Sequence, residues 1–225
     1  VYELGPDFGT NFLCFNQNPQ RNPTTGKPFL PPHKLAWFQD LTFRRAVAHA
    51  IDKPSMIDIV LRGLGSLQHA AMSPSAGFFY NASVPMYPYD PGIAREILRQ
   101  GGYVDRDGDG IIEDAAGHPI EFTLFTNSGN TDRVQIADLI RKDLEQLGMK
   151  VHFTQLEFNN LVAKLDASYD WDALMLGLTG GIEPHFGRNV WHSSGHLHLW
   201  HPRQAQPATV WESEIDRLFD QGVQE

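Results

Sequence analysis

Apolar residues recur at helical spacing through Phe38–Gly65, and this pattern predicts two consecutive helices. The break falls at residues 51–54, where Pro54 fits the first turn of the second helix because no intrahelical N–H is needed there. Asp40 and Asp52 are placed to cap the two helices, since a short side-chain oxygen accepts a hydrogen bond from a free backbone N–H. We interpret the pair as scaffold, because its apolar stripes account for its residues without a ligand.

The remaining pattern alternates between strands and helices. Strands are predicted at residues 11–16, 120–126, 150–157 and 171–178, and helices at residues 92–100, 131–147, about 161–165 and from 211 to the end. The Pro-rich residues 17–37 and 63–90 predict long irregular loops. This order is typical of an α/β sheet that contains parallel strands and is flanked by helices. Ligands of such sheets bind beyond the carboxyl ends of strands, so the loop after residue 178 is the first candidate site.

Length and charge narrow the class of protein. A chain of 225 residues can bury one good core or two small ones. A net charge of −9 argues against nucleic acid as a partner. No apolar run approaches the ~18 residues of a membrane span, and no signal peptide opens the chain. The single cysteine excludes an internal disulfide. Both ends look cut, so we expect a lobe excised from a larger two-lobed protein.

The loop from Leu178 to Phe186 carries two adjacent glycines, whose bare backbone suits close approach by a ligand. The expected ligand contacts here are Thr179, Gly180, Gly181 and Glu183, followed by Trp191 and, from the loop at residues 63–90, Phe79. Glu183 is the candidate for charge recognition. The alternative for the loop aromatics is that they pin their loop to the core.

An acidic run places Asp105, Asp107 and Asp109 at alternate positions, with Glu113 further on. Alternating acids before a glycine are what a Ca²⁺ loop needs. The twelfth position, where an EF-hand has a bidentate glutamate, is Ala116, and a strand follows instead of a helix. We therefore interpret the run as a solvated acidic turn, with a structural calcium as the alternative, and expect no other cofactor.

Residues 191–201 are dense in histidine, and neutral imidazole is a good ligand for nickel, zinc or copper. His192, His196 and His198 are the candidate ligands of a metal-binding module. No cysteine or well-placed carboxylate completes a tetrahedral set. The histidines therefore form the alternative hypothesis, against a role in loop packing or on the surface.

Catalysis is not indicated by the sequence. The chain has no GxSxG nucleophile elbow and no glycine-rich phosphate loop with Lys-Ser/Thr. Ser193 and Ser194 beside His192 are too generic a grouping to define a triad. We expect a protein that is not an enzyme.

Three stretches together carry a family resemblance. The helix pair has Phe38, Asp40, Phe43-Arg44 and Ala46, then Ala50-Ile51-Asp52-Lys53, and so resembles the helix pair of the family 5 extracellular solute-binding proteins of ABC transporters, the oligopeptide, dipeptide and nickel binders. The acidic run is similar to one that this family carries between helix and strand. Residues 207–216 resemble the family's closing Thr-x-Trp-Glu-x-x-Ile-Asp helix.

The resemblance spans nearly the whole chain and implies that residues 1–225 form a single ligand-binding lobe, the carboxy-terminal lobe of a type II periplasmic-binding-protein-like fold. It further implies a periplasmic or extracellular protein that captures a small polar solute, such as an oligopeptide, between two lobes and delivers it to ABC permease subunits. Any membrane attachment, as in a lipoprotein, would use an anchor outside these residues. In peptide-binding members, a Gly-Trp-x-x-Asp motif pairs its Asp with the peptide amino group. Here Leu178 replaces the Trp, and the Asp position holds Gly181 or falls in a one-residue gap.

Overall fold

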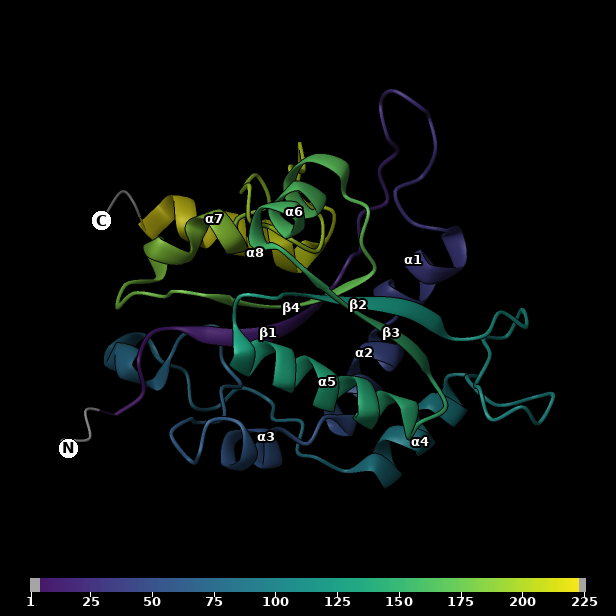
Figure 1. The fold of residues 1–225 in the computed structure, drawn as a ribbon. Coiled ribbons are helices and arrows are strands. Elements are labelled where there is room, and N and C mark those ends of the chain that lie inside the picture. The colour runs from purple at the N-terminus through teal and green to yellow at the C-terminus, as the bar shows by residue number, and fades with distance from the viewer. Residues whose placement is uncertain (1–4, 223–225) are drawn as a thin grey trace.

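A computed structural model describes residues 5–222 of the chain. A four-stranded sheet with strand order β1-β4-β2-β3 forms its middle layer (Figure 1). The strands are β1 (Thr10–Phe15), β2 (Glu121–Asn127), β3 (Lys150–Leu156) and β4 (Ala173–Leu178). β2 runs parallel to β3 and β4, whereas β1 is antiparallel to β4. The sheet is therefore mixed and flanked by helices, as the sequence predicted.

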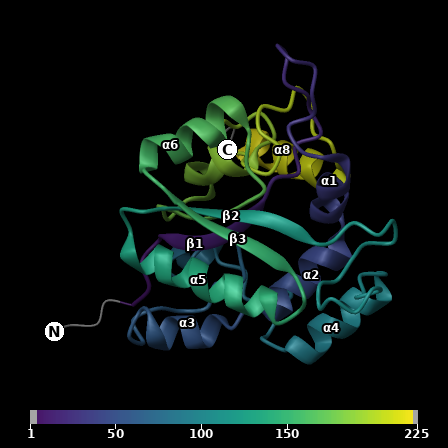
Figure 2. The same cartoon turned by 45° about the vertical axis from the view of Figure 1, so that its right-hand side comes forward.

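Helices cover both faces of the sheet (Figures 1 and 2). The α-helices are α1 (Pro32–Gln39), α2 (Leu41–Ala50), α3 (Lys53–Ile59), α4 (Pro91–Gln100), α5 (Thr131–Glu145), α6 (Phe158–Ala163), α7 (Arg188–Trp191) and α8 (Val210–Gly222). Two 3₁₀ helices, η1 (Pro74–Phe79) and η3 (Pro184–Gly187), and a π-helical turn, η2 (Lys164–Ser168), complete the set. None of the helices within residues 5–222 has the length and apolarity that a membrane crossing requires.

An aromatic cluster joins the helix pair to the sheet. Phe15 of β1 stacks on Phe38 with ring centroids 4.9 Å apart, and it meets Phe43 and Phe122 edge to face. All four rings are buried in the main core, which extends under α4 and α5. A smaller core, which includes Leu161 of α6, lies on the opposite face. The helix pair therefore does serve as scaffold, because its apolar stripe faces the main core.

Both predicted caps of the helix pair are confirmed. Asp40 accepts a hydrogen bond from the Thr42 N–H at 2.8 Å, and Asp52 accepts one from the Ser55 N–H at 3.1 Å. Asp40 also accepts a hydrogen bond from the Tyr103 hydroxyl at 2.8 Å, and this bond connects the start of α2 to the segment after α4. The carboxylates thus fix helix ends and tertiary packing together.

Some boundaries differ from the sequence predictions. The segment 17–37 is not irregular throughout, because α1 begins at Pro32, where proline is tolerated in a first helical turn, and it buries Trp37 and Phe38. The segment 63–90 is irregular except for η1. The predicted helix at 131–147 ends at residue 145. The last residues of the predicted final helix, 223–225, lie outside the described residues.

Candidate functional site

The predicted binding edge is one end of the sheet. β2 and β4 finish there, and β1 begins there because it is antiparallel to β4, with Thr10 opposite Leu178. The loop after β4 leaves from this point, and η1 is attached beside it through the Ser73 hydroxyl, which donates to the Asp7 carbonyl oxygen at 2.6 Å. We call this region the sheet end: residues 8–11, η1, residues 127–133 and residues 177–187 (Figure 1, left).

Atoms of the chain itself fill part of the space beside both loop glycines. A Cβ on Gly180 would lie 2.2 Å from the Phe8 carbonyl oxygen, and one on Gly181 would lie 2.6 Å from the Phe186 ring. The prediction that they leave backbone open to a ligand is therefore incomplete, since part of that space holds the protein's own atoms. Thr179 and Glu183 remain exposed on either side of them.

The exposed side chains of the sheet end include one acid and several apolar groups. Within residues 5–222, the Glu183 carboxylate has no hydrogen bond or ion pair, although its backbone carbonyl oxygen accepts the Phe186 N–H at 3.2 Å. Phe186 and Ile182 in the same loop are 74% and 56% exposed. In η1, Phe79 packs edge to face on Phe78, which is 95% exposed. Apolar surface of this kind, next to an unpaired charge, is typical of a site that is completed by a partner or a ligand.

Trp191 borders the sheet end, because a Cβ on Gly187 would lie 3.0 Å from its ring. It belongs to α7, is partly buried, and packs against Trp200 with ring centroids 5.8 Å apart; Trp200 in turn meets Trp211 at 6.2 Å. Its ring therefore supports the packing of α7 and the following segment on α8.

Sequence reasoning missed a polar cluster at the sheet end. Arg133 in the first turn of α5 donates from Nε to Asn11 Oδ1 at 3.0 Å and from one terminal nitrogen to Asn127 Oδ1 at 3.3 Å. Its other terminal nitrogen lies over Gly177, where a Cβ would come within 2.3 Å of it. The only sequence signal was a basic residue early in a helix that directly follows a strand.

A mainly apolar cavity of about 380 Å³ opens beside the end of β4. Gly177 and Leu178 of β4 line one side of it, and α6 lines another. Its polar rim holds Asp166, Asn189 and His196. Asp166 is paired with Arg203 at 2.9 Å, so its charge is already balanced.

The described structure separates the three candidate histidines of the run. His198 is fully buried, its Nε2 lies 3.2 Å from Glu212, and its Nδ1 lies 3.0 Å from the Val190 carbonyl oxygen. His192 is buried with its Nδ1 2.9 Å from the Ser194 hydroxyl, whereas His196 is exposed. Within residues 5–222, these three rings do not gather closely enough to share an ion.

Glu212 is the centre of a buried polar network instead. Its carboxylate accepts hydrogen bonds from Trp200 Nε1 at 3.2 Å, Gln204 Nε2 at 3.0 Å and the Thr209 hydroxyl at 2.8 Å, besides its contact with His198. Burial by itself raises the pKa of Glu212, but these hydrogen bonds outweigh it and lower the pKa to about 2. We call these five residues the Glu212 network.

The network contains the expected capping pair of α8. The Glu212 N–H donates to the Thr209 hydroxyl at 3.2 Å, and the Glu212 carboxylate reaches back to the Ala208 N–H at 3.0 Å. Besides capping α8, the same carboxylate holds the histidine run. The run is therefore structural.

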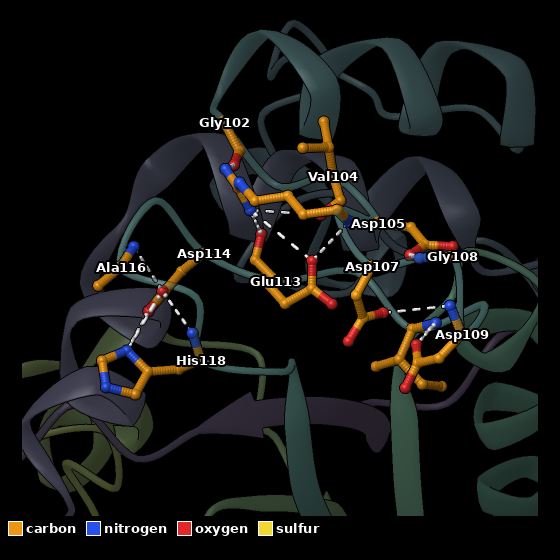
Figure 3. A network of polar contacts seen from close by, with 12 residues as sticks. Gly102, Val104, Asp105, Asp107, Gly108, Asp109, Glu113, Asp114, Ala116 and His118 are labelled. Atoms are coloured by element: carbon orange, nitrogen blue, oxygen red, sulfur yellow. Dashed lines mark hydrogen bonds and ion pairs between the residues drawn. The ribbon is translucent and has the colours of Figure 1, made fainter.

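The acidic loop brings its predicted residues together (Figure 3). Oxygens of Asp105, Asp107, Asp109 and Glu113 all lie within 4.8 Å of one another. Each carboxylate also accepts a backbone N–H of the loop itself: Asp105 accepts from residues 108 and 110, Asp107 from 109, Asp109 from 111, and Glu113 from 106. These bonds hold the loop as a closed acidic turn.

Comparison with known proteins identifies the fold. The family model of bacterial extracellular solute-binding proteins, family 5 (middle), matches residues 1–196. A probable ABC transporter-binding protein of Deinococcus radiodurans is 29% identical over an alignment of 201 residues that covers 84% of this chain and 34% of that protein. The oligopeptide-binding protein AppA of Bacillus subtilis is 32% identical over 159 residues, which are 70% of this chain and 29% of that protein.

The solved structure of that AppA, in complex with a nonapeptide, superposes with a TM-score of 0.77 at 26% identity and covers 96% of this chain and 38% of its own. The architecture is therefore one lobe of a periplasmic-binding-protein-like α/β fold. The chain belongs to family 5 of the bacterial extracellular solute-binding proteins. It spans about a third of the length of the relatives named above.

Proposed function

We propose that this chain is the carboxy-terminal lobe of the solute-binding component of an ABC importer and that the solute binds against the sheet end. The observation that carries the proposal is the combination there of an unpaired carboxylate, Glu183, with exposed rings at Phe78 and Phe186. Membership of a solute-binding family supports it. The carboxyl ends of β2 and β4 are also where open α/β sheets bind ligands.

In this proposal, the sheet end is half of the site, and a second lobe supplies the other half. The solute contacts both lobes and therefore favours the closed arrangement by its higher affinity for that state. The binding protein works outside the cytoplasm, in the periplasm or at the cell surface. In its closed form it delivers the solute to the permease subunits in the membrane. The role is capture and delivery without chemical conversion.

For the class of solute, we propose a peptide. The AppA relative is described as oligopeptide-binding and was solved with a nonapeptide. In this chain, the position of the aspartate that pairs with the peptide amino group in peptide binders holds Gly181 or falls in a one-residue gap. Glu183, two residues on and without a partner in the described structure, takes that role in our proposal. A buried ammonium group needs such a charge partner once the lobes have closed.

Calorimetry tests this function with alanine-based peptides of three, five and nine residues. The protein is the longest natural chain that contains residues 1–225. We expect binding of at least one peptide at micromolar affinity, and about a tenfold loss for Glu183→Gln, which removes one charge-assisted contact. Glu214→Gln, an exposed glutamate on α8, is the matched control. Absence of binding to every peptide would overturn the proposed solute class.

The same titration on residues 1–225 alone tests the two-lobed mechanism. With only half of the contacts present, we expect weak binding or none. Micromolar affinity of the isolated lobe would contradict the need for a second one.

A further inference from the structure

The Arg133 guanidinium is held at the sheet end by neutral partners only. Its two hydrogen bonds go to the side-chain amide oxygens of Asn11 and Asn127, and Asn127 is itself only 6% exposed. Within residues 5–222, Arg133 has no ion pair. Amide oxygens orient a guanidinium, but they do not neutralise its charge.

Another arginine on the same helix shows the usual arrangement. Arg141 in α5 forms ion pairs with Asp138 at 2.7 Å and Glu145 at 2.6 Å, and its pKa is raised by these bonds. The guanidinium N–H donors of Arg141 are therefore bound by acids of the same helix. Arg133, about two turns earlier, keeps its positive charge available at the end of the sheet.

The geometry around Arg133 is fixed before any ligand arrives. Its partners come from β1 and β2, and it lies across the end of β4 because Gly177 has no side chain to displace it. A guanidinium that three elements hold in place loses little side-chain entropy when it binds an anion. Arg133 is half-buried, so part of it still faces solvent.

We propose that Arg133 binds a carboxylate group of the solute at the sheet end. This inference rests on the proposed function and adds the chemical class of one recognised group. The planar fork of an arginine matches a carboxylate in two parallel hydrogen bonds, whereas Asn11 and Asn127 set the fork's direction. Together with Glu183, the sheet end then offers one negative and one positive group to a solute that carries both charges.

The test compares peptides that differ only in their carboxylates. The same tri-, penta- and nonapeptides are titrated as free acids, as carboxy-terminal amides, and as amides with one central glutamate. The protein is again the longest natural chain containing these residues. The variants are Arg133→Gln and Arg133→Lys, with Arg141→Gln as the control on the same helix, and thermal unfolding checks that each is folded.

We expect the wild type and Arg141→Gln to bind the free acids about tenfold to a hundredfold more tightly than the plain amides. Arg133→Gln should bind both forms equally, and Arg133→Lys should keep part of the preference because it retains the charge but not the fork. Recovery of affinity by the glutamate-bearing amide would show that a side-chain carboxylate is the group bound, and failure to recover would assign the carboxy terminus.

A second variant leaves the arginine in place. Gly177→Ala puts a Cβ within 2.3 Å of the guanidinium and should remove the free-acid preference as Arg133→Gln does. Equal affinity of the wild type for acids and amides, or an unchanged preference in both Arg133→Gln and Gly177→Ala, would overturn the inference while the solute-binding function stands. If the wild type binds none of the peptides, the proposed solute class fails and this inference fails with it.

Discussion

The sheet end and the Glu212 network differ in how their charges are satisfied. At the sheet end, Glu183 and Arg133 have no partner of opposite charge within residues 5–222. In the Glu212 network, one carboxylate receives several hydrogen bonds and is 2% exposed. The histidine run is the denser collection of candidate ligands, yet the structure uses it for packing. Charged side chains that lack partners at an accessible edge of the sheet indicate a binding site. A high density of potential ligand residues does not indicate one by itself.

The largest effect should come from removing the centre of the buried network. Glu212→Ala leaves His198, Trp200 and Gln204 without their common acceptor, and we expect it to lower the free energy of unfolding by about 3 kcal/mol. Glu183→Ala at the sheet end should change it by less than about 0.5 kcal/mol. Urea unfolding of both variants measures the difference, and similar losses in the two would contradict it.

The pH dependence of stability should follow the same carboxylate. Because folding lowers the pKa of Glu212 from 4.5 to about 2, its contribution is fully present above pH 4.5 and is lost as the pH falls toward 2. Glu212→Gln should therefore show a flatter decline in unfolding midpoint over this window than the wild type. Parallel curves for the two proteins would show that the Glu212 network does not hold a charged acid.

An intermediate effect, confined to binding, is expected at the exposed rings of the sheet end. Phe78→Ala should weaken solute binding about fivefold, because the ring loses apolar contact with the solute, and should leave the unfolding midpoint unchanged. Val210→Ala, which alters a residue that is 88% exposed next to the Glu212 network, is the control. Calorimetry on both variants decides this, and equal affinities would remove η1 from the site.

The smallest effect is expected at the acidic loop. Its carboxylates accept backbone N–H groups of the loop, and the twelfth position is Ala116, so millimolar Ca²⁺ should not change the unfolding midpoint relative to a chelator. A Ca²⁺-dependent rise that Asp107→Asn abolishes would instead establish the structural calcium.

Local signals in the sequence predicted most of the fold. The caps at Asp40 and Asp52 and the strand–helix alternation after residue 120 depend on neighbours a few residues away, and the structure confirms them. The helix α1 was missed because the prolines of residues 17–37 indicated a loop, whereas Pro32 stands at a helix start. Its stability comes from burial of Trp37, which a local pattern does not reveal.

Part of the candidate site could not be predicted from the sequence because it depends on long-range contacts. Asn11 lies 122 positions before Arg133, so no local pattern joins them. The sequence pattern around Gly180 predicts backbone that is open to a ligand. It does not reveal that the Phe8 carbonyl oxygen approaches Gly180. The structure does place the glycine loop at the carboxyl end of β4. This position could be predicted because the alternation of strands and helices indicates which strand ends carry loops suited to ligand binding.

Hydrogen exchange with and without a bound peptide tests the central proposal most directly, on the longest natural chain that contains residues 1–225. Solute capture at the sheet end predicts slower exchange in residues 177–187 and 127–133 when the peptide is present, with no change in residues 198–212. Protection that falls in residues 198–212 and leaves the sheet end unchanged would contradict the proposal.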